Sequence, residues 1–141
     1  MPSFSYPPGG PPADLLVEGR GATLGEAIAS AALGMFNSIT PVEGVSPSEE
    51  FLADAEGSDI QSLLFNLLDE LLYINDMQGL VAHDCAVEVD EEKLKARVKC
   101  RGERFEPGRH EPGIAVKAIT YHMMNISREG GGWVVRVVFD T

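Results

Sequence analysis

Residues 59–79 read DIQSLLFNLLDELLYINDMQG and contain the longest periodic pattern in the chain. From Ile60 to Leu72, leucine or isoleucine recurs every three or four residues, which places one wide apolar stripe along a helix. Gly79 follows as the kind of residue at which helices end. The stretch therefore predicts an amphipathic helix that begins near Asp59 and packs on a core.

The hydrophobic period changes from about 3.6 to two after this helix. Alternating apolar and polar residues, separated by Gly-rich or polar turns, predict strands with one face in the core. Four strands are predicted in this half, over residues 85–89, 94–100, 118–126 and 133–139.

The first half of the chain supplies a second helix. Thr23-Leu24-Gly25-Glu26 is a capping-box pattern, in which the Thr hydroxyl and the Glu carboxylate satisfy free amides at a helix start. Short strands are predicted on either side, over residues 15–19 and 50–55. Helices grouped early and strands grouped late are typical of an α+β fold.

We therefore predict a single α+β domain over residues 13–141, with two amphipathic helices packed on a mixed, mainly antiparallel β-sheet. Residues 1–12 include the run PPGGPP. Pro removes backbone donors and Gly adds entropy, so this stretch is predicted to be a flexible leader.

Composition narrows the function classes. The 141 residues carry a formal net charge of −11. The electrostatic field of this charge repels nucleic acid and attracts a basic partner or a cation. No apolar run approaches the roughly 20 residues needed to span a bilayer, and the N-terminus lacks the pattern of a secretory signal. A cytoplasmic location is expected, with the nucleus added if the source is eukaryotic.

Cys85 and Cys100 are the two cysteines, and both fall on the apolar sides of predicted strands. Two cysteines do not define a disulfide framework, so buried thiols in a reducing compartment are the favoured interpretation. The three histidines lie at no recognised metal-ligand spacing, so zinc has little support.

Five basic side chains alternate along one predicted strand face: Lys93, Lys95, Arg97, Lys99 and Arg101. They could dock an acidic partner or RNA phosphates. They could equally form a solvated strand face paired with Glu88 and Asp90 across the hairpin, and we favour this second interpretation.

A site for a hard metal ion has more support in the sequence than a zinc site. Asp140 ends an apolar strand beside the terminal carboxylate of Thr141, which concentrates negative charge. Oxygen ligands favour Ca²⁺ or Mg²⁺ over zinc. From spacing alone, a solvated chain end is the simpler alternative.

Several stretches resemble the archease family, over residues 13–141. The most specific is Val116-Lys117-Ala118-Ile119-Thr120-Tyr121-His122-Met123, combined with the Phe139-Asp140 ending. The other matching stretches are residues 23–27, 57–64, 68–73, 101–105 and 109–112.

The resemblance implies a function that composition does not. Archeases are α+β proteins that stimulate guanylylation and multiple turnover of the RtcB-type RNA ligase of tRNA splicing, and they are not themselves enzymes. The family's acidic metal site carries over to Asp14, Asp140 and the terminal carboxylate of Thr141, with Ca²⁺ the expected ion. Arg109, His110 and Lys117 are the expected contacts with the ligase or its complex.

The opening motif departs from the family pattern. Archeases typically begin with Tyr-x-x-Leu-Asp-His-Thr-Ala-Asp, and here the matching run is residues 6–14. Gly10, Pro11 and Pro12 replace the first Asp, the His and the Thr. Losing a charged oxygen ligand predicts weaker Ca²⁺ binding.

Two other functions compete with ligase activation. A general chaperone or adaptor for nucleic-acid-processing enzymes would need no metal. A metal-dependent phosphoester hydrolase would need a general base and usually two metals. The sequence shows neither a candidate general base nor a two-metal arrangement, so the hydrolase hypothesis ranks last.

Overall fold

The apolar stripe of residues 60–72 lies on the buried face of helix α2 (Ile60–Gln78) in a computed structural model, which describes residues 3–11 and 14–141. Asp59 caps this helix by accepting a hydrogen bond from the Ser62 amide. Gly79 ends it with φ of 69°, a left-handed conformation that favours glycine. The predicted start and end of the helix are both confirmed.

Helix α1 (Leu24–Ile39) begins with the predicted capping box. The Glu26 amide donates to the Thr23 hydroxyl, and the Glu26 carboxylate accepts from the Thr23 amide. Pro41 follows the helix end and begins a short 3-10 turn, η1 (Val42–Gly44).

Seven strands form two separate sheets. Sheet A has the order β1 (Ser3–Ser5), β2 (Leu15–Gly21), β7 (Gly132–Asp140) and β6 (Ala118–Glu129). Sheet B has the order β3 (Glu49–Glu56), β5 (Lys95–Arg104) and β4 (Leu80–Asp90). Every strand pair in the two sheets is antiparallel.

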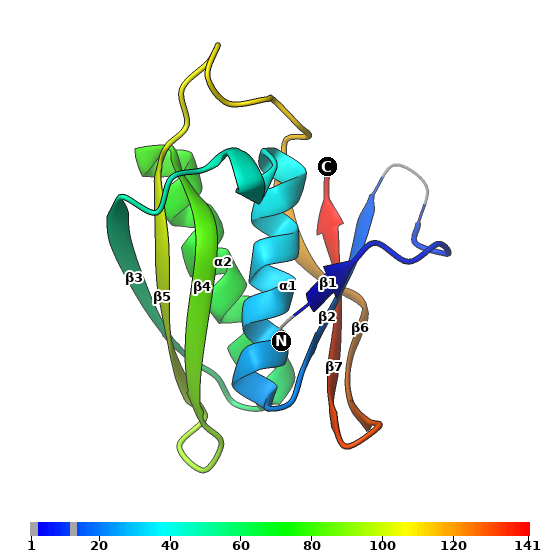
Figure 1. Ribbon diagram of the computed structural model, residues 1–141. Coiled ribbons are helices and arrows are strands. Elements are labelled where there is room, and N and C mark those ends of the chain that lie inside the picture. The colour runs from blue at the N-terminus through cyan, green and yellow to red at the C-terminus, as the bar shows by residue number, and fades with distance from the viewer. Residues whose placement is uncertain (1–2, 12–13) are drawn as a thin grey trace.

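The two helices lie between the two sheets, as Figure 1 shows. Both helices contact both sheets, and the buried leucines of α2 join one core with the inner faces of β7 and β5. The predicted α+β class, with two amphipathic helices packed on antiparallel strands, is confirmed. The structure adds that the strands divide between two layers, because sheet B is built from residues 49–104 and sheet A from the two ends of the chain.

The N-terminal segment differs from the predicted flexible leader. Residues 3–5 form β1, which pairs with β2. The Tyr6 hydroxyl then donates to the Gly34 carbonyl at 2.8 Å and accepts from Asn37. These contacts hold residues 3–6 against β2 and α1 and do not support a flexible leader over this part of 1–12. The predicted boundary after residue 12 falls outside the described residues.

The outer face of sheet B carries the predicted basic row. β5 is the central strand, so its exposed cations face acidic residues on both neighbouring strands. Arg97 bonds Asp54 at 2.7 Å, Lys99 lies 3.6 Å from Glu50, and Arg101 bonds Asp84. A solvated, ion-paired face is confirmed. The register sets Glu88 opposite Arg97 and Asp90 opposite Lys95, as predicted, and Asp54, Glu50 and Asp84 add closer ion pairs.

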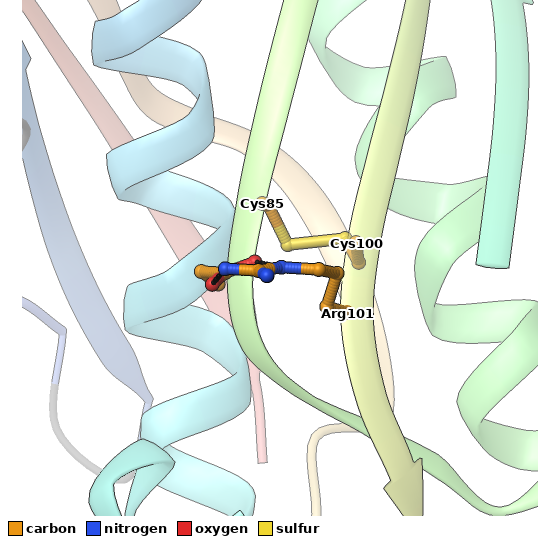
Figure 2. The surroundings of a disulfide bond; sticks show 4 residues. Cys85, Cys100 and Arg101 are labelled. Atoms are coloured by element: carbon orange, nitrogen blue, oxygen red, sulfur yellow. Dashed lines mark hydrogen bonds and ion pairs between the residues drawn. A yellow bond between two sulfur atoms is a disulfide. The ribbon is translucent and has the colours of Figure 1, made fainter. Parts of the chain in front are cut away.

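Cys85 and Cys100 form a disulfide between β4 and β5 (Figure 2). The prediction of two buried free thiols is wrong. It followed the apolar pattern of each strand alone and could not include the register, which places the two residues directly opposite each other.

Within the described residues, no helix combines the length and the apolar character required to cross a membrane.

Candidate functional site

Asp14 and Asp140 lie at the same end of sheet A. β2 and β7 pair in a register that sets Leu15 opposite Phe139 and Leu16 opposite Val138. Asp14 immediately precedes Leu15, and Asp140 immediately follows Phe139. The two aspartates therefore lie one residue beyond the last pair of this ladder, at the same end of the sheet. Two residues far apart in sequence, 14 and 140, are thereby brought to the same end of sheet A.

The direction of the Asp140 side chain follows from strand alternation. Phe139 is fully buried in the core against the helices, so its neighbour Asp140 is on the outer face of β7. Asp140 is exposed and Asp14 is half-buried. The Asp14 amide donates to the Pro11 carbonyl at 3.2 Å, which turns the chain into the start of β2.

Strand β6 brings Lys117 to the same edge. Ala118 pairs with Asp140, and the Lys117 amide donates to the Asp140 carbonyl at 2.8 Å. The Lys117 side chain is exposed. Of the three predicted partner contacts, Lys117 is the one placed directly beside the predicted metal residues.

The donor chemistry here fits a hard cation, although the set of donors is small. Asp14, Asp140 and the terminal carboxylate of Thr141 offer oxygen ligands only, the type that Ca²⁺ and Mg²⁺ prefer. In residues 3–11 and 14–141, no group of three or more His, Cys, Asp and Glu side chains could hold a metal ion. Ca²⁺ takes about six to eight oxygens, so water or a partner would complete the shell.

Position 10 cannot supply the missing carboxylate without a local change. A Cβ atom built on Gly10 would lie 2.9 Å from the Cβ of Leu16, which is closer than real side chains approach. The N-terminal segment therefore passes close over β2 because residue 10 has no side chain. Pro12 and Ala13 of the same motif lie outside the described residues.

The segment between β5 and β6, residues 105–117, crosses the same end of the molecule, at the top of Figure 1. It is attached to the C-terminal end of α1. The amides of Gly113 and Ile114 donate to the carbonyls of Ile39 and Ser38, each at 2.8 Å. These bonds satisfy carbonyls that have no partner within the helix and fix the segment.

Glu103 holds the start of this segment. Its carboxylate accepts from Arg109 Nη2 at 2.5 Å, from the Ser46 amide at 2.7 Å and from His110 Nε2 at 2.9 Å. The hydrogen bonds from Arg109, Ser46 and His110 lower the pKa of Glu103 to about 2. Because the side chain is only 11% exposed, these donors replace water around a buried charge.

The hydrogen bonds around His110 define its tautomer. The Glu106 amide donates to Nδ1 at 2.8 Å, so Nδ1 carries the lone pair. The proton therefore lies on Nε2, which donates to Glu103. The ring also stacks on Phe105, with centroids 5.5 Å apart.

The structure assigns different roles to Arg109 and His110 than the sequence suggested. The His110 side chain is fully buried, so the prediction that it touches a partner does not fit. Arg109 is 46% exposed, but its guanidinium already binds Glu103 and Glu106. Both residues support the fold of the 105–117 segment. Glu103 and Ser46 were missed as site residues. The sequence signal for Glu103 was its place in the family-like stretch 101–105, just after a predicted strand.

Comparison with known proteins gives a consistent match. The model of the archease protein family matches residues 9–141. The protein archease of Pyrococcus furiosus is 42% identical over 131 residues, covering 91% of this chain and 92% of the relative. The archease-like protein of Drosophila melanogaster is 37% identical over 132 residues, covering 91% and 85%.

Two solved structures have the same fold. The solution structure of protein 1598 of Methanobacterium thermoautotrophicum superposes with a TM-score of 0.81 at 33% identity, covering 99% of this chain and 98% of that one. A crystal structure of an archease from Thermotoga maritima, described as a possible chaperone, gives 0.61 at 22% identity, covering 97% and 98%. By sequence and by fold, the chain belongs to the archease family.

Proposed function

We propose that this protein is a non-enzymatic cofactor that stimulates guanylylation and turnover of an RtcB-type RNA ligase in tRNA splicing. The observation that supports this most is the register between β2 and β7. It brings Asp14 and Asp140 to one end of sheet A, beside the exposed Lys117. Membership of the archease family supports the proposal, because the ligase is the partner that the family resemblance implies.

In this proposal a divalent cation, Ca²⁺ first, is held between the carboxylates of Asp14, Asp140 and Thr141. The ion would neutralise the carboxylates and fix the N-terminal segment against the end of β7. Because the described residues offer few ligands at this site, open coordination positions would remain for the partner. Lys117 and the exposed edge of Arg109 would contact the ligase around this site.

The acidic character of the molecule supports a protein partner in place of free nucleic acid. The net charge of −11 repels phosphates and attracts a basic surface, such as the rim of a site that itself binds RNA and GTP. The basic row from Lys93 to Arg101 does not offset this, because three of its five cations are paired with carboxylates on β3 and β4.

The test is ligase guanylylation with Asp140→Ala. The account predicts that this variant loses stimulation, at least about tenfold in rate, while it stays folded. Asp76→Ala is the matched control, because Asp76 is exposed on α2 and the substitution changes the net charge equally. Full stimulation by Asp140→Ala would overturn the role of Asp140.

A chaperone or adaptor without metal dependence is the second candidate. Two observations favour it: the small number of metal-ligating side chains in the described part of the chain and the relative described as a possible chaperone. A chelator separates the two functions. If partner binding and stimulation are unchanged in excess chelator, the adaptor replaces the metal-dependent cofactor.

A further inference from the structure

The disulfide occupies the closest type of position on an antiparallel ladder. Cys85 on β4 and Cys100 on β5 are directly opposite, with Cα atoms 4.0 Å apart. Antiparallel strands alternate between wider hydrogen-bonded pairs and narrower pairs without direct hydrogen bonds, and the narrower spacing brings side chains together. The two sulfur atoms therefore meet because of the strand register.

The register between β4 and β5 does not depend on the disulfide alone. β5 is paired along its length on both sides, with β3 and with β4. Next to the bridge, Arg101 Nε donates to Asp84 Oδ1 at 3.0 Å, and a second bond joins the same side chains (Figure 2). Cys100 also lies in the core cluster. With the bridge open, these contacts would keep the two thiols adjacent.

The two sulfurs differ in access. Cys100 is fully buried, whereas Cys85 lies on β4, an edge strand of sheet B, and is partly exposed. Residue Cys85 also borders a surface hollow of about 450 Å³ on the outer face of the sheet, while its side chain, opposite Cys100, is on the core side and is reached at the edge of β4. The other lining residues are Glu50, Asp84, Ala86, Lys99 and Arg101.

The charges around the hollow are balanced. Two cations and two carboxylates line it, and they form the pairs Arg101–Asp84 and Lys99–Glu50. An anionic thiol is therefore repelled less strongly here than by the rest of an acidic molecule.

We propose that the Cys85–Cys100 pair is a reversible modification site, opened by a small thiol of the glutathione class and closed again without refolding. A thiolate of the reductant attacks Cys85 Sγ, the Sγ–Sγ bond breaks, and Cys100 leaves as a thiolate that takes up a proton. A second reductant thiolate then attacks the reductant sulfur of the mixed disulfide. That step releases Cys85 as a thiol and the reductant as its own disulfide, so two electrons pass from two thiols to the protein bridge.

The first experiment uses the wild-type protein in glutathione buffers of graded redox ratio. Thiols are quenched by alkylation and counted by intact mass, while circular dichroism follows the fold. The proposal predicts that two thiols appear together as the buffer becomes reducing, and that the bridge returns on oxidation while the spectrum stays native. Unfolding in step with reduction would overturn it, and so would a folded protein that never forms the bridge.

The second experiment tests the point of attack. Cys100→Ala leaves the Cys85 thiol, and Cys85→Ala leaves the Cys100 thiol, so the two variants are matched controls. In folded protein, the Cys85 thiol should react with a maleimide or with oxidised glutathione at least about tenfold faster, because access and thiolate character set the rate. Equal rates, or a faster Cys100, would overturn the proposal. These readouts use no ligase, so they are independent of the proposed function.

Discussion

Glu103 shows how one side chain can connect segments that are distant in sequence. Its carboxylate receives donors from residue 46, before β3, and from residues 109 and 110, after β5. A buried carboxylate without such donors would be costly, so the charge and its three donors stabilise one arrangement of the loops. The alternation along the strands did not predict these contacts. It indicates which face of a sheet a residue occupies and not which loop packs against that residue.

The low pKa of Glu103 predicts a pH dependence of stability. Its pKa is about 2 in the folded protein against a reference of 4.5, so the unfolded state binds a proton first as the pH falls. The stabilisation is complete above about pH 4.5 and is lost as the pH approaches about 2. Urea unfolding across this window should show a smaller loss for Glu103→Gln than for the wild type.

The control for this measurement is Glu91→Gln in the exposed turn between β4 and β5. It should follow the wild-type pH dependence. Equal pH dependence in Glu103→Gln and in the wild type would show that Glu103 does not carry the effect.

The two aspartates lead to a binding prediction at the residue scale. If one ion contacts both carboxylates, Asp14→Asn and Asp140→Asn should each weaken Ca²⁺ binding about tenfold or more, since each removes a charged oxygen ligand. The double variant should lose little beyond the stronger single variant, because both act on one site. Calorimetric titration of Ca²⁺ measures all three, and additive losses would argue for separate sites.

At the scale of elements, the ends of α2 show which features local sequence determines. Gly79 adopts φ of 69°, and a Cβ there would meet only Arg104 Cγ, at 3.6 Å. The cost of Gly79→Ala is therefore conformational, about 1–2 kcal/mol of unfolding free energy. Gly44→Ala is the matched control, since Gly44 has no positive φ and nothing within 4 Å of an added Cβ.

Denaturant titration would check this pair of variants. Gly44→Ala should stay within about 0.5 kcal/mol of the wild type. Similar free energies for both variants would mean that the left-handed end of α2 is not important for stability.

Sequence predicted the elements better than their assembly. The caps of α1 and α2 and the strands around residues 85–100 and 118–139 depend on neighbours in sequence, and they were found. The division into two sheets and the strand β1 depend on pairings between distant residues, which periodicity does not encode. The candidate site shows the same limit: the sequence singled out Lys117 and Asp140, whose roles stay predictions, but their adjacency and the burial of His110 required the fold.

The disulfide between β4 and β5 leads to a prediction about the stability of the fold. It joins residues 15 apart, and closing a loop of that length in the unfolded chain corresponds to about 3 kcal/mol. Thermal unfolding of the wild type in excess thiol should show a lower midpoint than in its absence. The double variant Cys85→Ala/Cys100→Ala should show no such response, and a response in that variant would mean that thiol acts elsewhere.

For the whole molecule, the central feature is that residues 14 and 140 of an acidic chain lie at the same end of sheet A. Sheet B, the two helices and the Glu103 contacts support this end without contributing its carboxylates. A partner that recognises the site must therefore tolerate negative charge, and a bound cation would reduce that charge where contact occurs.

The proposed metal-dependent activation is tested by a guanylylation time course of an RtcB-type RNA ligase, with and without this protein and at graded Ca²⁺ and Mg²⁺. We expect this protein to increase the rate of guanylylation. The increase should grow with the concentration of the divalent ion and should be lost when a chelator removes the ion. Acceleration of equal size at every ion concentration, chelator included, would contradict this expectation.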